Sequence, residues 1–325
     1  MNGTPRHVAI IGAGSIGVAF SVVFSRAGWS VVVQEPDATR REAAPLELAD
    51  CLRGLAEFGL LAEDASTVLK RVSFTAELEK AVGNADLVQE CAPERVELKR
   101  ELFERLETCA PRDALLASSS SALPVSAYSD RLATRGRCLV AHPGNPPYLI
   151  PVIELVPASF TDASVMERAV ALYTQVGLKP VRVEREVEGF VFNRLQGAVL
   201  REAYCLVRDG VASVEDVDTV VREGLGLRWS FLGPFETVDL NTRGGIASHA
   251  LKMGPAYARM GAERGQSDEW TPELVSRVEA QRRAILPLDQ WANRVRWRDR
   301  MLMRLRSMRS GDGGGVEPWP PESAS

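Results

Sequence analysis

The sequence contains few of the side chains that bind transition metals. Only three histidines and five cysteines occur among its 325 residues. No two cysteines form a CxxC motif, and the five are scattered along the chain: Cys51, Cys91, Cys109, Cys138 and Cys205. A structural zinc site needs clustered Cys and His ligands. We therefore expect no metal site, and five reduced thiols, mostly buried, in a reducing compartment.

Long hydrophobic runs and a strong excess of one charge are also missing. No apolar stretch approaches the roughly 20 residues that span a bilayer, and the segment before the first apolar run does not resemble a signal peptide. The net charge is −4, whereas a dedicated nucleic-acid-binding protein is normally basic. We expect a cytoplasmic protein that binds neither membrane nor nucleic acid. Its length suffices for two domains of about 100–200 residues each.

A glycine-rich segment follows the first apolar run. Residues 7–11 have the composition of a strand and lead directly into the GAGSIG sequence of residues 12–17. A segment compatible with a helix (18–27) and a second strand (30–33) come next. This order of strand, glycine-rich turn, helix and strand is the context in which GxGxxG predicts a dinucleotide-binding fold.

The three glycines have different expected roles. Gly12 permits the tight turn, Gly14 lets the backbone approach a pyrophosphate, and Gly17 allows the helix to pack closely on the strand. Ser15 and Ile16 lie at the start of the helix, where backbone amides are free to donate to phosphate oxygens. Together they predict a phosphate-binding turn.

Glu35 bears on the choice of dinucleotide. It lies 18 residues after Gly17, where a carboxylate can accept hydrogen bonds from the adenosine ribose and would repel a 2′-phosphate. Arg40 and Arg41 follow closely and could favour a phosphate, unless they lie on a solvated helix face. We expect NAD as the cofactor.

The remainder of the first half alternates strands with helices. Strands are predicted at residues 72–75, 86–90, 115–118, 139–142 and 152–156, and helices at 38–61, 77–82 and 93–109. This alternation predicts an α/β fold with a Rossmann-type, doubly wound, mostly parallel sheet. Ligands bind such sheets at the carboxyl ends of the strands.

Polar side chains coincide with two of these strand ends. The serine run Ser118–Ser121 ends one strand and His142 ends the next, so we expect both at one cleft. Glu154 follows on the next strand. A hydroxyl, an imidazole and a carboxylate are the groups that a proton-transfer site needs. The run itself does not indicate which serine acts.

After residue 188 the strand pattern stops. Helices are predicted at residues 191–208, 214–223 and 235–240, and most of 244–308 has a helical period. We therefore predict a nucleotide-binding domain over residues 1–188 and an all-α domain over residues 189–309. Residues 310–325, which are rich in Gly, Pro and Ser, predict a disordered tail.

Two polar residues and one basic helix stand out in the second domain. Asn193 is either a surface amide or a site residue. Arg228 lies in an apolar, glycine-containing segment and needs an anionic partner, which could be an internal carboxylate such as Glu236 or the substrate. The helix at residues 291–309 carries seven arginines. It could bind nucleic acid or acidic lipid, but a surface helix with its tryptophans and leucines packed inward fits the pattern better.

Taken together, the motifs resemble the 3-hydroxyacyl-CoA dehydrogenase superfamily, and most closely the branch that contains L-gulonate 3-dehydrogenase and lens λ-crystallin. The resemblance covers residues 7–309. It rests on Glu35 and on the segments GAGSIG, ECAPERVELK, LLASSSSALP, HPGNPP, IELVP, GFVFNRLQ and GLGLRWSFLGPFET.

This resemblance implies roles for individual residues. His142 matches the family's catalytic histidine, and Glu154 matches the carboxylate that orients it. Ser121 and Asn193 match the active-site serine and asparagine. The resemblance therefore selects Ser121 from the serine run.

Further positions follow from the same resemblance. Glu94 and Lys99 match residues that approach the nicotinamide-side ribose. Gly144 stands where relatives carry a larger residue, which would widen the pocket. The family also implies a homodimer.

The chemistry so implied is oxidation of a secondary alcohol beta to a carboxyl group. Neutral His142 would take the hydroxyl proton while hydride passes to NAD, and Glu154 would fix the imidazole tautomer. Ser121 and Asn193 would hydrogen-bond the reacting oxygen.

Arg228 favours a free acid over a thioester, because a guanidinium can bind a carboxylate through two hydrogen bonds. We expect a small 3-hydroxy carboxylic acid, with L-gulonate first. L-carnitine is an alternative, since Trp229, Phe231 and Phe235 could cage its quaternary ammonium. A 3-hydroxyacyl-CoA dehydrogenase and a non-catalytic structural protein are the others, although intact site residues disfavour the last.

Overall fold

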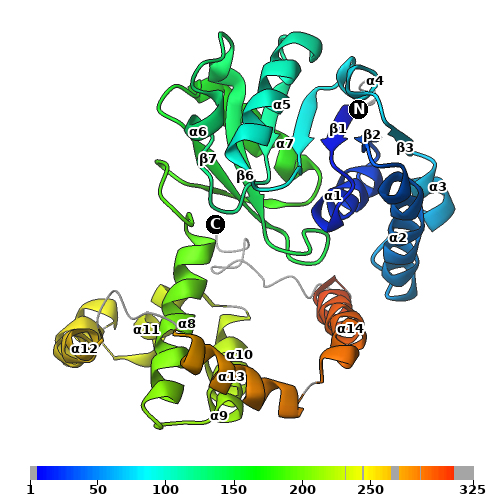
Figure 1. The fold of residues 1–325 in the computed structure, drawn as a ribbon. Coiled ribbons are helices and arrows are strands. Elements are labelled where there is room, and N and C mark those ends of the chain that lie inside the picture. Colours follow the sequence, from blue (N-terminus) through cyan, green and yellow to red (C-terminus); the bar gives the residue numbers. More distant parts are fainter. Residues whose placement is uncertain (1–5, 231, 244, 265–270, 286, 311–325) are drawn as a thin grey trace, which may run out of the picture. The chain divides into compact units, whose positions relative to one another are not determined.

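The computed structural model describes residues 6–230, 232–243, 245–264, 271–285 and 287–310. These residues form two compact units (Figure 1). The first comprises residues 6–194 together with 299–310, and the second comprises residues 195–298. The division predicted from the sequence lies at residue 188, and the observed division lies slightly later. The end of the last helix also belongs to the first unit.

The first unit is built on one sheet, which has eight strands in the described part of the chain, in the order β3-β2-β1-β4-β5-β6-β7-β8. The strands are β1 His7–Ile11, β2 Ser30–Gln34, β3 Val72–Thr75, β4 Leu87–Glu90, β5 Leu115–Ser118, β6 Cys138–Pro143, β7 Val152–Pro157 and β8 Lys179–Arg182. All neighbouring pairs are parallel except β6 and β7, which are antiparallel. The prediction of a doubly wound, mostly parallel sheet is confirmed.

Helices connect these strands. In the first unit they are α1 Ser15–Arg26, α2 Ala38–Glu57, α3 Ala65–Leu69, α4 Leu78–Val82, α5 Val96–Cys109, α6 Ser126–Ser129 and α7 Ala163–Gln175, with one 3₁₀ turn at Arg135–Arg137. The second helix ends at Glu57 rather than at residue 61, because Gly59 takes a positive φ of 66° and terminates it.

Both faces of the sheet are buried. Val8 and Ile10 of β1 face a core formed with α1, α2 and α7, whereas Ala9 and Ile11 face a second core formed with α4 and α5. Side chains alternate along a strand, so a central strand covered on both sides must be apolar at every position. This explains why the first strand reads as a continuous apolar run.

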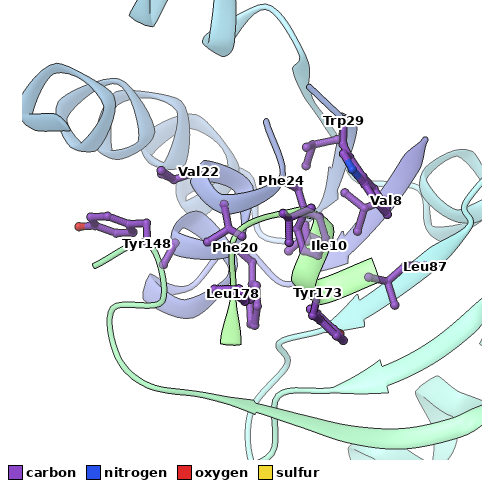
Figure 2. Close-up of a cluster of buried hydrophobic side chains, with 14 of the residues drawn as sticks. Val8, Ile10, Phe20, Val22, Phe24, Trp29, Leu87, Tyr148, Tyr173 and Leu178 are labelled. Carbon is purple, nitrogen blue, oxygen red and sulfur yellow. The ribbon is translucent and has the colours of Figure 1, made fainter. Parts of the chain in front are cut away.

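Aromatic side chains fill the first of these cores. Phe24 lies with its ring centroid 5.2 Å from that of Trp29, 6.1 Å from that of Phe20 and 6.2 Å from that of Tyr173 (Figure 2). Burying one such side chain contributes about 1.5–3 kcal/mol. The core therefore anchors α1 against the sheet, and with it the glycine-rich turn that precedes this helix.

The end of the last helix, α14 (Trp291–Ser310), packs on the first unit. Met303 is buried at 5% exposure, and a Cβ at Gly54 would lie only 3.1 Å from its Cε. Arg300 forms a 3.3 Å ion pair with Glu57 on the same helix, α2. The glycine on α2 therefore makes room for the methionine of α14.

The side chains that α14 turns inward differ from those expected. Leu302 and Met303 contact the core, whereas Trp297 is 46% exposed and Leu305 is 42% exposed. The basic helix is thus a surface helix, as the preferred interpretation has it, but Trp297 does not provide the packing.

The second unit is helical. Its elements are α8 Phe192–Arg208 from residue 195 onward, α9 Val214–Thr219, a π-helical segment Val220–Leu225, α10 Gly226–Trp229, α11 Pro234–Asn241, α12 Gly245–Glu263, α13 Pro272–Ile285, a 3₁₀ turn Leu288–Gln290 and the first part of α14. Arg264 binds Glu202 at 3.0 Å and Asp209 at 2.6 Å, which ties the end of α12 to α8. Hydrogen bonds from Arg208 and from Arg264 together lower the pKa of Asp209 to about 2. Of the predicted tail, residues 310–325, Ser310 ends α14 and residues 311–325 lie outside the described residues.

Within the described part of the chain, no helix is both long enough and apolar enough to cross a bilayer.

Candidate active site

The glycine-rich turn leaves room for side chains at one glycine only. Gly12 has a φ of +100°, and a Cβ there would lie 2.9 Å from the carbonyl oxygen of Cys91. A Cβ at Gly17 would lie 1.9 Å from the carbonyl oxygen of Gly12, but at Gly14 it would meet nothing within 4 Å. Gly12 and Gly17 are therefore required by the fold, whereas Gly14 keeps a space open beside the start of α1.

That space belongs to a cavity of about 640 Å³. Gly12 and Gly14 line it together with Glu35 and Arg40. Since α1 begins at Ser15, its first amides precede any intrahelical hydrogen bond and are available to phosphate oxygens. The size and lining of this cavity fit a dinucleotide.

Glu35 is fixed at the end of β2. Its Oε2 accepts a hydrogen bond from the amide of Ala13 at 2.9 Å, and its Oε1 accepts one from the amide of Asp37 at 3.1 Å. The carboxylate is thereby held against the glycine-rich turn, as a ribose-binding residue would need to be.

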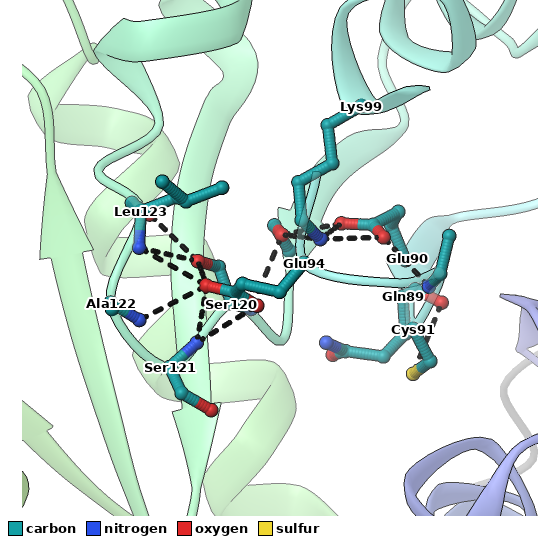
Figure 3. A network of polar contacts seen from close by, with 11 residues as sticks. Gln89, Glu90, Cys91, Glu94, Lys99, Ser120, Ser121, Ala122 and Leu123 are labelled. Atoms are coloured by element: carbon teal, nitrogen blue, oxygen red, sulfur yellow. Dashed lines mark hydrogen bonds and ion pairs between the residues drawn. The ribbon is translucent and has the colours of Figure 1, made fainter. Parts of the chain in front are cut away.

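Glu94 organises the loop that carries the serine run (Figure 3). Its Oε1 accepts a hydrogen bond from the Ser120 hydroxyl at 2.5 Å and from three successive amides, those of Ser121, Ala122 and Leu123, at 3.1 Å each. Partial burial opposes ionisation, but these hydrogen bonds outweigh it and hold the pKa of Glu94 below its usual value. The ionised carboxylate therefore shapes the backbone around Ser121.

Lys99 lies beneath this loop in a fully buried ion pair. Its Nζ lies 2.8 Å from each carboxylate oxygen of Glu90, and both side chains are 0% exposed (Figure 3). The Ser118 hydroxyl also donates to Glu90. The resemblance placed Lys99 beside the cofactor ribose, but in this structure its ammonium is bound to Glu90 and reaches no surface. Glu90 is thus a site-supporting residue that the sequence analysis missed.

His142 and Glu154 face each other across the antiparallel strand pair β6–β7. They are register partners, and the imidazole Nδ1–H donates to Glu154 Oε2 at 2.8 Å. Their side chains are 8% and 3% exposed. Because a carboxylate can only accept, this bond fixes the tautomer and leaves Nε2 as the basic nitrogen.

Two backbone amides hold the other oxygen of the same carboxylate. Glu154 Oε1 accepts from Val191 N at 2.7 Å and from Phe192 N at 2.9 Å. Burial would raise the pKa of Glu154, but the hydrogen bonds from His142 and from these amides outweigh it and lower the pKa. The carboxylate therefore stays ionised beside the imidazole.

An unusual turn aims these amides. Gly189 and Phe190 both have positive φ, 73° and 48°. A positive φ is costly for a bulky residue, so it persists only where the surroundings enforce it. Phe190 is fully buried, and its ring centroid lies 5.7 Å from that of His142. Its burial stabilises the turn that directs the next two amides at Glu154.

Asn193 joins the serine loop to this turn. Its Nδ2 donates to the carbonyl oxygen of Ser121 at 2.9 Å. The neighbouring Phe192 amide binds Glu154, and Glu154 binds His142. The four predicted residues thus lie in one connected network of the first unit.

Known proteins share this arrangement of segments. The chain matches the 3-hydroxyacyl-CoA dehydrogenase NAD-binding domain over residues 7–187 and the C-terminal domain of the same family over residues 189–285. A lambda-crystallin homolog from Bos taurus is 40% identical over 316 residues, which cover 94% of this chain and 96% of that protein. The chain belongs to the 3-hydroxyacyl-CoA dehydrogenase family.

Two further members of the wider group differ in what their names say they act on. An L-carnitine dehydrogenase from Pseudomonas sp. is 37% identical over 252 residues, 77% of this chain and 78% of that protein. The solved structure of 5-formyl-3-hydroxy-2-methylpyridine 4-carboxylic acid 5-dehydrogenase superposes with a TM-score of 0.81 at 27% identity, covering 95% of this chain and 99% of that one. Family membership makes this protein an NAD-dependent dehydrogenase that acts on a CH–OH group.

Arg228 lies in the second unit, on α10, with its side chain exposed. In the part of the chain that the structure describes, its guanidinium forms neither an ion pair nor a hydrogen bond, so Glu236 is not its partner. The neighbouring aromatic residues Trp229 and Phe235 are 40% and 77% exposed. Phe231, the third member of the expected aromatic cage, lies outside the described residues.

Gly144 does not open the site as expected. It is buried, and a Cβ at this position would lie 2.6 Å from Ile150 Cγ2 and 3.0 Å from Val152 Cγ1. Ile150 and Val152 occupy the space beside this glycine, so it opens no free volume, and the expectation of a wider pocket was wrong.

Proposed function

We propose that the protein oxidises the hydroxyl of a small 3-hydroxy carboxylic acid to the 3-keto acid, with L-gulonate as the first candidate. The observation that carries this proposal is the buried pair of His142 and Glu154, anchored by the amides of Val191 and Phe192. A histidine whose tautomer is fixed by a buried carboxylate is suited to removing a hydroxyl proton.

In this proposal, His142 Nε2 takes the proton of the substrate hydroxyl. Glu154 stabilises the imidazolium that forms, and the side chains of Ser121 and Asn193 hydrogen-bond the reacting oxygen. NAD, when bound, supplies the hydride acceptor. General-base assistance of this kind contributes about 10²–10⁴-fold to the rate.

Arg228 is proposed to bind the substrate carboxylate. An exposed arginine without an internal partner is free to form a bidentate ion pair with a small acid. A CoA thioester offers no carboxylate at the corresponding position. The unpaired state of Arg228 therefore favours a free acid over a 3-hydroxyacyl-CoA.

L-Carnitine is the second candidate. Its carboxylate could use the same arginine, and exposed Trp229 next to Arg228 offers a π-face for its quaternary ammonium. The similarity to the Pseudomonas L-carnitine dehydrogenase adds to this possibility.

The test is a comparison of initial NADH formation with L-gulonate, L-carnitine, 3-hydroxybutyrate and 3-hydroxybutyryl-CoA. The proposal expects the highest kcat/KM with a free acid, and a large rise in KM for that acid in Arg228→Met without a change in NAD affinity. A preference for the CoA ester, with unchanged kinetics in Arg228→Met, would place Arg228 outside the substrate site.

We also propose a homodimer formed by the helical unit. Exposed large apolar side chains are frequent there, among them Leu240 at 66%, Leu251 at 82% and Val220 at 63%. A cavity of about 360 Å³ between α8 and α9 is lined almost entirely by apolar groups. A mass of one chain in light scattering at micromolar concentration would contradict this proposal.

A further inference from the structure

Two arginines line the cavity near Glu35, and carboxylates already engage both. Arg105 Nη2 lies 3.1 Å from Glu79 Oε1. Both Nη atoms of Arg40 bind the carboxylate of Glu47, two turns later on α2, with Nη2 to Oε2 at 2.5 Å. The cavity wall therefore contains cations whose charge is cancelled by neighbours.

Arg40 has a third contact, which fixes it against the glycine-rich turn. Its Nε donates to the carbonyl oxygen of Ala13 at 2.6 Å. The amide of the same residue donates to Glu35 at 2.9 Å. The backbone of Ala13 is thus held by a carboxylate and a guanidinium, and Arg40 remains beside the cavity through Nε even if its two Nη atoms are released.

Arginine in this neighbourhood is the group that accommodates a 2′-phosphate in enzymes that use NADP. Arg41 instead binds the backbone: its Nη1 donates to the carbonyl oxygens of Glu35 and Pro36 at 2.8 and 3.2 Å. Of Arg40 and Arg41, only Arg40 lines the cavity, and its guanidinium binds a carboxylate through its two Nη atoms. The hydrogen bond to Glu47 raises the pKa of Arg40, and the same bond lowers the pKa of Glu47, so the pair is ionised at neutral pH.

We propose that Glu47 is a positioning residue for cofactor selection: by holding the Nη fork of Arg40, it withholds from a 2′-phosphate the cation that would bind it. Glu35 repels such a phosphate, and Glu47 occupies the group that would attract it. The preference for NAD over its 2′-phosphorylated counterpart then depends on two carboxylates, only one of which lies in the cavity lining. The inference does not depend on which hydroxy acid the enzyme oxidises.

Binding of 5′-AMP and of 2′,5′-ADP, two ligands that differ only in the 2′-phosphate, tests this directly by calorimetry. Glu47→Gln should bind 2′,5′-ADP about five- to tenfold more tightly than the unmodified protein does, which is the scale of one charge-assisted contact at a partly exposed site. Its affinity for 5′-AMP should stay within about twofold of that of the unmodified protein. Glu47→Asp, which keeps the carboxylate, should discriminate between the two ligands as the unmodified protein does. Glu42→Gln, which removes the same charge from an exposed position on the same helix, should change neither.

The double variant Arg40→Met/Glu47→Gln should lose the increased affinity for 2′,5′-ADP. If the double variant still binds 2′,5′-ADP more tightly, the effect comes from net charge and the inference is wrong. Equal weakening of both ligands by Glu47→Gln would mean that Glu47 only supports the glycine-rich turn, and unchanged affinities would mean that Arg40 cannot reach the phosphate. Either result overturns the inference.

Discussion

The Nδ1 of His142 lies 2.8 Å from Oε2 of Glu154, across an antiparallel pair in a sheet whose other neighbouring strands, among those described, run parallel. The antiparallel pairing matters for the site. In a parallel pair, residues near the carboxyl end of one strand lie beside those near the carboxyl end of the next. Here the reversed β7 brings a residue from its first half opposite the end of β6. The carboxylate can therefore approach the imidazole from within the sheet, shielded from solvent.

Replacing Glu154 by Gln should lower kcat by about 10²-fold or more, with little change in NAD affinity. The carboxylate accepts from His142 on one oxygen and from two amides on the other, but an amide side chain has a single acceptor oxygen. The NH₂ group of Gln must then face either the imidazole Nδ1 or the two backbone amides. In neither arrangement are all three hydrogen bonds kept, so the tautomer of the imidazole is no longer fixed. Steady-state kinetics with the preferred substrate measure this loss. Glu184→Gln, at an exposed position, is the matched control, and equal activities in the two variants would refute the orienting role.

The same carboxylate should make stability depend on pH in the acid range. Glu154 has a lowered pKa in the folded protein, because hydrogen bonds outweigh its burial. A glutamate in the unfolded chain has a pKa of about 4.3. The contribution of the ionised Glu154 to the free energy of unfolding is therefore complete above that pH and is lost as the pH falls through the pKa of the folded protein. The stability difference between the unmodified protein and Glu154→Gln should therefore be largest near neutral pH and shrink below about pH 4. Urea unfolding at several pH values measures it, and a difference that grows on acidification would contradict the assignment.

Two glycines of the turn should respond differently to alanine. Gly17→Ala should destabilise the protein, because its Cβ would lie 1.9 Å from a backbone oxygen. Gly14→Ala should leave the melting temperature nearly unchanged, since its Cβ meets nothing, but it should raise the Kd for NAD by filling space that the phosphates need. Thermal melts and NAD titration distinguish the two. An unchanged Kd in Gly14→Ala would show that the phosphates bind elsewhere.

Replacing Lys99 should lower the free energy of unfolding. Lys99→Met leaves the buried carboxylate of Glu90 without a counter-charge, which costs about 3–5 kcal/mol. Adding Glu90→Gln should recover part of that loss, because no uncompensated charge then remains. Urea unfolding of the two variants checks this. A normal stability in Lys99→Met together with a sharply raised Kd for NAD would restore the ribose contact that the resemblance implies.

The elements nearest the cofactor could be predicted from local sequence. The glycine-rich turn is determined by steric limits at single residues, and β1, β3 and β5 have the predicted bounds. For β1 and β5 the reason is that each is a short, mostly buried apolar run. The helix at Ala163–Gln175 was not predicted, although its buried residues Val165, Met166, Ala169, Leu172 and Tyr173 follow a helical spacing. That omission could have been avoided from the sequence.

Other features could not be read from local pattern. The direction of β7 relative to β6 is a property of pairing, and neither strand's composition encodes it. The helical period of residues 291–309 predicts a helix but not that its second half belongs to the other unit. The buried pair of Lys99 and Glu90 looks like two ordinary surface charges in sequence. Only the folded structure reveals that they face each other and that both are fully buried.

The central claim is that His142 removes the hydroxyl proton. The most direct test is kcat of His142→Gln with the preferred hydroxy acid, measured as NADH formation across pH, together with the Kd for NAD. The account predicts a fall in kcat of about 10²–10⁴-fold, an unchanged Kd, and the loss of the acid limb of the pH profile that the imidazole imposes. A kcat within a few-fold of the unmodified protein, with the acid limb intact, would contradict it.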